Sequence, residues 1–247
     1  MPRYLITIEY DGSDFVGWQR QDNGPSVQAA LEAGATAIIG GRQQVAVQGA
    51  GRTDAGVHAT GQAAHFDLPT SFDTAKLPLA LNAHLPPSVR VLLAQSVADD
   101  FNARFDATGR AYRYRLWTRR IPPALERGRV WAVGGDLDLA AMEAAAAYLI
   151  GKHDFTSFRA AQCQAASPLK TLDQLRFENE ENGLGLVVEA RSFLHHQVRN
   201  ITGTLVEVGR GKWPPEKVGE ILAARDRAAA GPTAPAEGLY LTRVDYP

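Results

Sequence analysis

The sequence predicts an α+β protein made of two βαββαβ repeats, with antiparallel sheets and helices packed on one face. Two observations predict this class. Short stretches that alternate apolar and polar residues, as half-buried strands do, are separated by stretches whose apolar residues recur at helical spacing. Their order in residues 1–105, βαββαβ, then recurs in residues 106–247. The alternative is coincidence, since many mixed chains can be divided in this way.

The first repeat opens with a strand over residues 4–10, which ends at the turn sequence DGSD. Ser26 is the expected N-cap of a helix over residues 27–38, and Gly40 and Gly41 end that helix. The remaining elements are strands at residues 44–48, 62–66 and 89–97 and a helix near residues 74–84, where Pro78 leaves the start open.

The second repeat follows the same order. Asp136 or Asp138 stands near the start of its first helix, as an N-cap does. Strands are expected at residues 110–117, 171–177, 184–191 and 239–244, and helices at residues 139–150, 193–208 and 215–225.

Composition limits the class of protein. The 247 residues are 45% hydrophobic, which suits one large domain or two small ones. The single cysteine, Cys163, excludes an intrachain disulfide and has no motif around it, so we interpret it as an incidental thiol in a reducing compartment. The N-terminus lacks a signal peptide, and no apolar run is long enough for a bilayer. These features favour a soluble cytoplasmic protein.

Charge is distributed unevenly along the chain. The net charge of −1 gives no reason to expect a nucleic-acid partner. Residues 109–135, however, hold seven arginines against one acid, Glu126, a local net charge of +6. A chain that is neutral overall but carries such a basic tract can bind a polyanion on one face.

Residues 49–59, GAGRTDAGVHA, are the most unusual stretch. One interpretation is a turn with a solvated arginine. Three glycines in eight residues exceed what a turn needs, however, and glycine suits a backbone that approaches another molecule closely. In an extended stretch Arg52 and Asp54 point the same way, and a neighbouring arginine stabilises an ionised carboxylate. Asp54 is therefore a candidate nucleophile or base.

Two further stretches carry candidate residues. In RAYRYRLW, residues 110–117, arginines that can contact phosphates alternate with aromatic rings that can stack on bases. Taken alone, this stretch fits an ordinary strand better, with tyrosines in the core and arginines outside. In FLHHQVRNITG, residues 193–203, His195 and Arg199 share a face of the expected helix, and Arg199 is either a partner for a carboxylate or a surface arginine. Adjacent histidines lack metal-binding spacing, and no phosphate-binding glycine motif is present, so no metal or nucleotide cofactor is expected.

Six motifs together resemble the tRNA pseudouridine synthase A family, in the same order and along almost the whole chain. They are YDGSDFVGWQRQ, GRTDAGVHA, FNARFDATGRAYRYRL, GKHDFTSF, FLHHQVRNITG and APAEGLYL. The resemblance implies a pseudouridine synthase fold with two ferredoxin-like subdomains, residues 1–105 and 106–247, flanking a central cleft. It also implies a homodimer that converts uridine to pseudouridine at positions 38, 39 and 40 of the tRNA anticodon stem-loop, without a cofactor or metal.

The resemblance also implies roles for individual residues. Asp54 matches the catalytic aspartate, Arg52 the arginine implicated in base flipping, Tyr112 the tyrosine that packs on the target uracil and Arg199 the basic residue near the aspartate. His195 stands where the family often has tyrosine, so its role is open. The residues expected to contact RNA are Phe101, Asn102, Ala103, Arg104, Phe105, Arg120, Gln162, Cys163, Gln164, Ala165 and Ala166.

Several alternatives stay open at this stage. Asp54 can attack C1′ or the base, or remove a ribose proton. A catalytically silent RNA-binding module would need the basic tract but not Asp54. An N-glycoside hydrolase would release free uracil and usually needs a second carboxylate, for which the sequence offers no obvious candidate.

Overall fold

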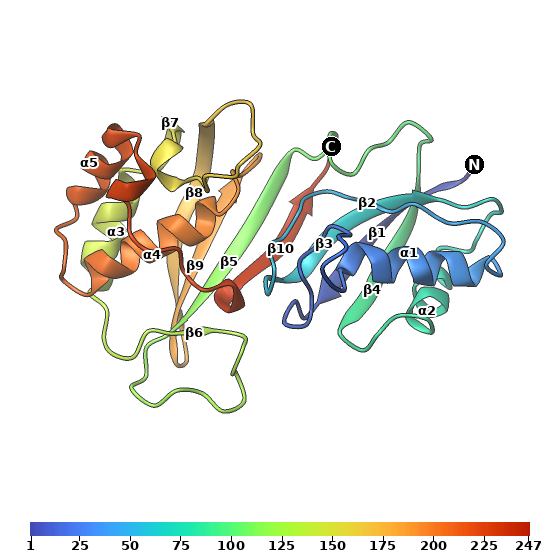
Figure 1. Cartoon of the computed structure of the whole chain (residues 1–247), viewed down its shortest axis with the longest axis horizontal. Coiled ribbons are helices and arrows are strands. Elements are labelled where there is room, and N and C mark those ends of the chain that lie inside the picture. Colours follow the sequence, from blue (N-terminus) through green and yellow to red (C-terminus); the bar gives the residue numbers. More distant parts are fainter. The chain divides into compact units, whose positions relative to one another are not determined.

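The computed structural model describes residues 1–247, which form two compact α+β units (Figure 1). Unit 1 comprises Met1–Thr108 and Tyr240–Pro247, and unit 2 comprises Gly109–Leu239. The sequence places all of residues 106–247 in one part, whereas the last eight residues belong to unit 1. No helix is long and apolar enough to cross a membrane.

Unit 1 contains a sheet in the order β4-β1-β3-β10, with the short strand β2 paired to β3. All of its pairs are antiparallel except β10 with β3, which is parallel. The strands are β1 (Arg3–Tyr10), β2 (Gln48–Gly49), β3 (His58–Asp67), β4 (Val89–Val97) and β10 (Leu239–Asp245), and the helices are α1 (Val27–Ile38) and α2 (Leu77–Asn82). Along residues 1–105 the elements follow in the order β1-α1-β2-β3-α2-β4.

Local signals set the ends of α1 as predicted. Ser26 caps the helix, because its Oγ accepts a hydrogen bond from the Ala29 amide at 3.2 Å. Gly40 and Gly41, with φ of 78° and 71°, turn the chain away in the left-handed conformation that favours glycine. In α2, Pro78 lies in the first turn, where its missing N–H leaves no helical bond unmade, so the helix begins later than expected.

The predicted strand over residues 44–48 is wrong, since only Gln48 at its end joins β2. The backbone amides of this segment bind side chains of α1 instead of a neighbouring strand. The Val45 amide donates to Thr36 Oγ1 at 3.1 Å, and the Val47 amide donates to Glu32 Oε1 at 3.3 Å.

Unit 2 contains a sheet in the order β5-β9-β8-β7, antiparallel throughout, with the short β6 parallel to β5. Helices α3, α4 and α5 lie together beside it (Figure 1). The strands are β5 (Gly109–Trp117), β6 (Trp131–Ala132), β7 (Gly151–Asp154), β8 (Leu169–Glu180) and β9 (Gly183–Ala190), and the helices are α3 (Leu139–Ala147), α4 (Gln197–Gly209) and α5 (Lys217–Ala224). Asp138 is the N-cap of α3. The sequence analysis does not predict β6 or β7.

The helix predicted from residue 193 begins four residues later, at Gln197. His196 adopts the left-handed conformation, with φ of 62°, which breaks the helix before it starts. The Gln197 side chain accepts a hydrogen bond from the Leu194 amide at 2.8 Å and so holds a turn in place of a helical start. The expectation that His195 and Arg199 share a helix face is therefore wrong, because His195 lies in the turn.

Candidate active site

In unit 1 the glycine loop, residues 49–59, presents Arg52 and Asp54 on either side of a buried Thr53. Arg52 is exposed, Asp54 is half-buried, and Thr53 is 7% exposed. This alternation is what an extended stretch gives, and it directs Arg52 and Asp54 away from the interior, as predicted. The expected interaction between these two charges stays a prediction.

Thr53 anchors the loop to buried parts of unit 1. Its Oγ1 lies 2.8 Å from the hydroxyl of Tyr10 on β1, and its carbonyl accepts from the Trp18 amide at 3.0 Å. Gln62 on β3 donates from Nε2 to the Gly51 carbonyl at 3.0 Å. Burial raises the pKa of the Tyr10 phenol far above its ordinary value, so this hydroxyl stays protonated and hydrogen-bonded. Three bonds therefore fix the backbone on which Asp54 stands.

The structure requires glycine for a different reason at Gly49 and at Gly56, and it sets no such requirement at Gly51. Gly56 has φ of 75° and forms a turn in which the Val57 amide donates to the Asp54 carbonyl at 3.1 Å. A side chain at Gly49 would meet the Trp18 indole at 2.4 Å. Only Gly51 faces open space, so only this glycine has no packing or turn requirement in the folded chain. Gly51 is therefore the glycine for which close approach to RNA stays the predicted reason.

His58 fixes the end of the loop where β3 begins. The ring is 2% exposed, and its Nδ1 accepts a hydrogen bond from the Gly12 amide at 3.0 Å. The ring also stacks on Tyr240 of β10, with centroids 4.7 Å apart. Asp11 Oδ1 lies 3.2 Å from the same nitrogen. His58 therefore joins the glycine loop to β10 and to the chain after β1.

In unit 2, Tyr112 lies on β5 and is half-buried. Phe193 meets its ring edge to face, with centroids 5.1 Å apart and an angle of 86° between the planes. Such contacts favour one ring orientation. The alternating face that Tyr112 shares with Tyr114 and Leu116 is as predicted, and those two side chains are fully buried.

Arg199 and Tyr114 both hold the segment that precedes β10. Arg199 Nε donates to the Ala234 carbonyl at 2.8 Å, and the Tyr114 hydroxyl donates to the Pro235 carbonyl at 2.7 Å. Burial raises the pKa of the Tyr114 phenol well above its ordinary value. Arg199 is half-buried on α4, and the bond from its Nε holds the guanidinium in place. It therefore lacks the freedom of an exposed arginine.

The basic tract is less positive than its sequence suggests. Arg113 pairs with Glu178 at 2.7 Å and with Glu180 at 2.9 Å. Arg115 pairs with Glu126 at 2.8 Å and with Glu180 at 3.2 Å. The acids come largely from β8, which the sequence places far away. The net charge of +6 counted along the tract is therefore not the charge of a surface.

Arg119 and Arg120 of the same tract are exposed. Arg119 Nη1 donates to Asn182 Oδ1, a neutral acceptor, at 3.0 Å. Carboxylates offset the charges of Arg113 and Arg115, whereas Arg119 and Arg120 present their positive charges to solvent.

The segment of residues 101–105 divides into inward and outward parts. Phe101 packs on a buried cluster in unit 1, and Ala103 is fully buried. Asn102 Oδ1 accepts from the Arg104 and Phe105 amides at 2.9 and 3.2 Å and so shapes the turn. Arg104 and Phe105 are exposed. Phe101 and Asn102 are half-buried, and RNA contact stays a prediction for this segment.

Residues 162–166 lie in a loop of unit 2 between the short helix η1 (Thr156–Phe158) and β8. Gln162, Gln164 and Ala166 are exposed, whereas Cys163 and Ala165 are half-buried. RNA contact remains a prediction for all of these residues.

Comparison with known proteins identifies the family. A family model described as tRNA pseudouridine synthase matches residues 6–106 and 145–247. The chain belongs to this family. A relative from Rhodopseudomonas palustris strain HaA2, named tRNA pseudouridine synthase A, is 56% identical over 247 residues, and the alignment covers both chains completely. A relative of the same name from Rhodospirillum rubrum is 52% identical over 248 residues, covering 100% of this chain and 88% of the relative.

Membership of the tRNA pseudouridine synthase family confirms the resemblance seen in the six motifs. The matched ranges include Arg52, Asp54 and Arg199 but omit residues 107–144, which hold Tyr112 and most of the basic tract. The roles of single residues rest on the motifs and on the local geometry.

The sequence assigns no role to the residues that support the site. Tyr10, Thr53, His58 and Phe193 lie inside the six motifs, whereas Gln62 lies outside them. One signal was available. Gln62 stands in a predicted strand directly before the small residues Ala63 and Ala64, and a buried amide needs hydrogen-bond partners. Nothing in the sequence says that its partner is the Gly51 carbonyl.

Proposed function

We propose that this protein isomerises uridine to pseudouridine at positions 38, 39 and 40 of the tRNA anticodon stem-loop. Family membership supports the reaction and the tRNA substrate. The observation that carries the proposal is the glycine loop, in which a half-buried Asp54 stands on a backbone fixed by Tyr10, Trp18 and Gln62. Catalytic groups need such fixed placement.

The reaction breaks the C1′–N1 bond of uridine and forms a C1′–C5 bond to the same ribose, so it is redox-neutral and needs no cofactor. The target base must first leave its stack. Arg52, exposed beside Asp54, is suited to fill the vacated space or to hold a phosphate. Asp54 supplies a carboxylate that attacks C1′ or the base, or that removes a ribose proton.

Tyr112 and Arg199 complete the proposed machinery. The Tyr112 ring, oriented by Phe193, stacks on the detached uracil while the base rotates, and its hydroxyl assists proton loss from C5. Arg199 supplies a cation, and its hydrogen bond to the Ala234 carbonyl holds the guanidinium in position.

The wider assignments belong to the same proposal. Arg104, Phe105, Arg120 and residues 162–166 contact the tRNA. The protein forms a homodimer and works in the cytoplasm, where a reducing environment suits its one free cysteine, Cys163.

The test is single-turnover reaction with unmodified tRNA, followed by mapping of pseudouridine and assay of free uracil. We expect pseudouridine at the anticodon-arm positions and no free base. Release of uracil would indicate an N-glycoside hydrolase, and tight binding without reaction would indicate an RNA-binding module.

Asp54→Asn is the decisive variant. It keeps the side-chain size and removes the charge, so the rate should fall by about 10⁴ or more, a barrier increase of at least ~5 kcal/mol. The free energy of unfolding should change by no more than about 0.5 kcal/mol, and tRNA affinity should persist. A variant that retains a few per cent of the rate would remove Asp54 from the mechanism, and one that melts far earlier would make the loop a structural turn.

A further inference from the structure

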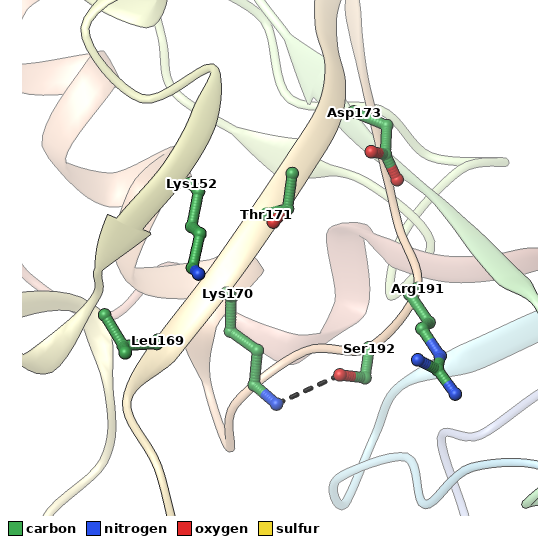
Figure 2. A pocket seen from close by; sticks show the side chains of 7 residues that line it. All are labelled: Lys152, Leu169, Lys170, Thr171, Asp173, Arg191 and Ser192. Atoms are coloured by element: carbon green, nitrogen blue, oxygen red, sulfur yellow. Dashed lines mark hydrogen bonds between the residues drawn. The ribbon is translucent and has the colours of Figure 1, made fainter.

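Unit 2 carries a basic hollow of about 210 Å³ at one end of its sheet. Its lining includes Lys152 of β7, Lys170 and Thr171 of β8, and Arg191 and Ser192 just after β9 (Figure 2). None of these residues belongs to the site proposed above or to the predicted RNA contacts.

Strand register brings these residues together. Lys152 pairs directly with Thr171 in the β7–β8 ladder. Leu172 pairs with Ala190 in the β8–β9 ladder, so the chain after β9 continues beside Thr171 and Lys170. Lys170 Nζ donates to Ser192 Oγ at 3.0 Å, a bond that Figure 2 shows across the hollow. The positions of the cations are thus set by backbone pairing.

The charges in the hollow are unbalanced. Three cations, Lys152, Lys170 and Arg191, face one acid, Asp173. None of the three cations forms an ion pair, and the partner of Lys170 is a neutral hydroxyl. In the same sheet, Arg113 and Arg115 are each matched by two carboxylates. Gathered cations that outnumber the carboxylates beside them repel one another and attract an anion.

We infer that this hollow binds one phosphate of the RNA backbone, an inference that rests on the proposed function. Two ammonium groups and a guanidinium supply charge-assisted hydrogen bonds, and the Ser192 and Thr171 hydroxyls are further donors. No aromatic ring lines the hollow, so it offers charge for a phosphate and no surface on which a base can stack. The predicted tRNA-contacting residues 162–166 lead directly into β8, which favours an RNA phosphate over a free one.

The test is the double variant Lys152→Gln with Lys170→Gln. Its matched control is Lys76→Gln with Lys217→Gln, which removes the same charge at exposed positions outside the hollow. tRNA affinity is measured across salt concentrations, and the pseudouridine rate is measured at saturating tRNA. We expect affinity to fall about tenfold, the salt slope to decrease by about one, and the rate at saturation to persist. The control should bind within about twofold of the unmodified protein.

Three outcomes would overturn the inference or separate it from the proposed function. An unchanged salt slope and affinity would overturn the RNA-phosphate site. Inorganic phosphate that binds the unmodified protein but not the double variant, with tRNA affinity unchanged, would assign the hollow to free phosphate instead. Salt-dependent tRNA binding that the double variant weakens, in a protein that forms no pseudouridine, would keep the site and refute the proposed reaction. If the double variant melts early, Lys152→Gln alone, at an exposed position, repeats the test.

Discussion

Tyr10→Phe should damage catalysis although Tyr10 is buried. The side chain is 4% exposed, and its ring lies beside Trp18 with centroids 6.2 Å apart, a contact that phenylalanine keeps. The substitution removes only the hydroxyl, which lies 2.8 Å from Thr53 Oγ1. The hydroxyl also interacts with the side chain of Gln62, so the substitution affects two of the groups that hold the glycine loop.

The size of the effect on stability and rate follows from the bonds that the variant keeps. Thr53 keeps the bond from the Trp18 amide to its carbonyl, and Gly51 keeps its bond from Gln62. A buried polar group that loses its partner costs about 1–3 kcal/mol, so the free energy of unfolding should fall by about 1–2 kcal/mol. A shift of Asp54 by a fraction of an ångström should slow the single-turnover rate by roughly 10- to 100-fold. Affinity for tRNA should stay within about twofold, because Tyr10 contacts no solvent.

Tyr4→Phe is the matched control. Tyr4 lies on the same strand, is fully buried, and its hydroxyl accepts a hydrogen bond from the Phe72 amide at 2.7 Å, away from the glycine loop. Both variants should lose comparable stability in a denaturant titration, but only Tyr10→Phe should lose rate. If the two variants turn over equally fast at saturating tRNA, the Thr53 anchor does not position Asp54.

Three further predictions concern turnover, binding and acid stability. Tyr112→Phe should lower the single-turnover rate more than tRNA affinity, because the ring still packs on Phe193; normal turnover would reduce Tyr112 to a stacking platform. Arg119→Glu with Arg120→Glu should weaken tRNA binding without lowering Tm, since both side chains are exposed; unchanged Kd would place the RNA elsewhere. The Arg3 guanidinium hydrogen-bonds Asp67 at 2.8 Å and lowers the pKa of that carboxyl, so this contribution to stability is present above the unfolded pKa and is lost as pH falls below about 4. Asp67→Asn should therefore be less stable than the unmodified protein at pH 7, and the difference should shrink as the pH falls through the folded pKa, as followed by urea unfolding.

Much of the fold was determined by local sequence. The strands β1, β4 and β5 and the helix α1 follow from alternation or helical spacing, and Ser26 and Asp138 cap their helices through bonds three residues away. These features depend on neighbours in the chain, which the sequence displays. The glycine loop and its residues Arg52 and Asp54 were likewise identified from one continuous motif.

Partners distant in the chain were decided only by tertiary structure. Residues 44–48 alternate as a strand does, yet their amides bind Thr36 and Glu32 of α1. Strand β10 pairs in parallel with β3, and Tyr240–Pro247 belong to unit 1 although they follow unit 2 in the sequence. The sequence predicts that Arg113 and Arg115 belong to an RNA-binding face. In the structure Glu178 and Glu180 of β8 form ion pairs with them.

The same limit applies to the candidate site. Motifs name the carboxylate Asp54 but not the Tyr10 hydroxyl or the Gln62 amide that fix its backbone. Periodicity encodes which face of an element is buried, because burial favours apolar side chains at a regular spacing. It does not encode which polar groups meet across that face, because a hydrogen bond or ion pair depends on where two distant segments lie once the chain has packed.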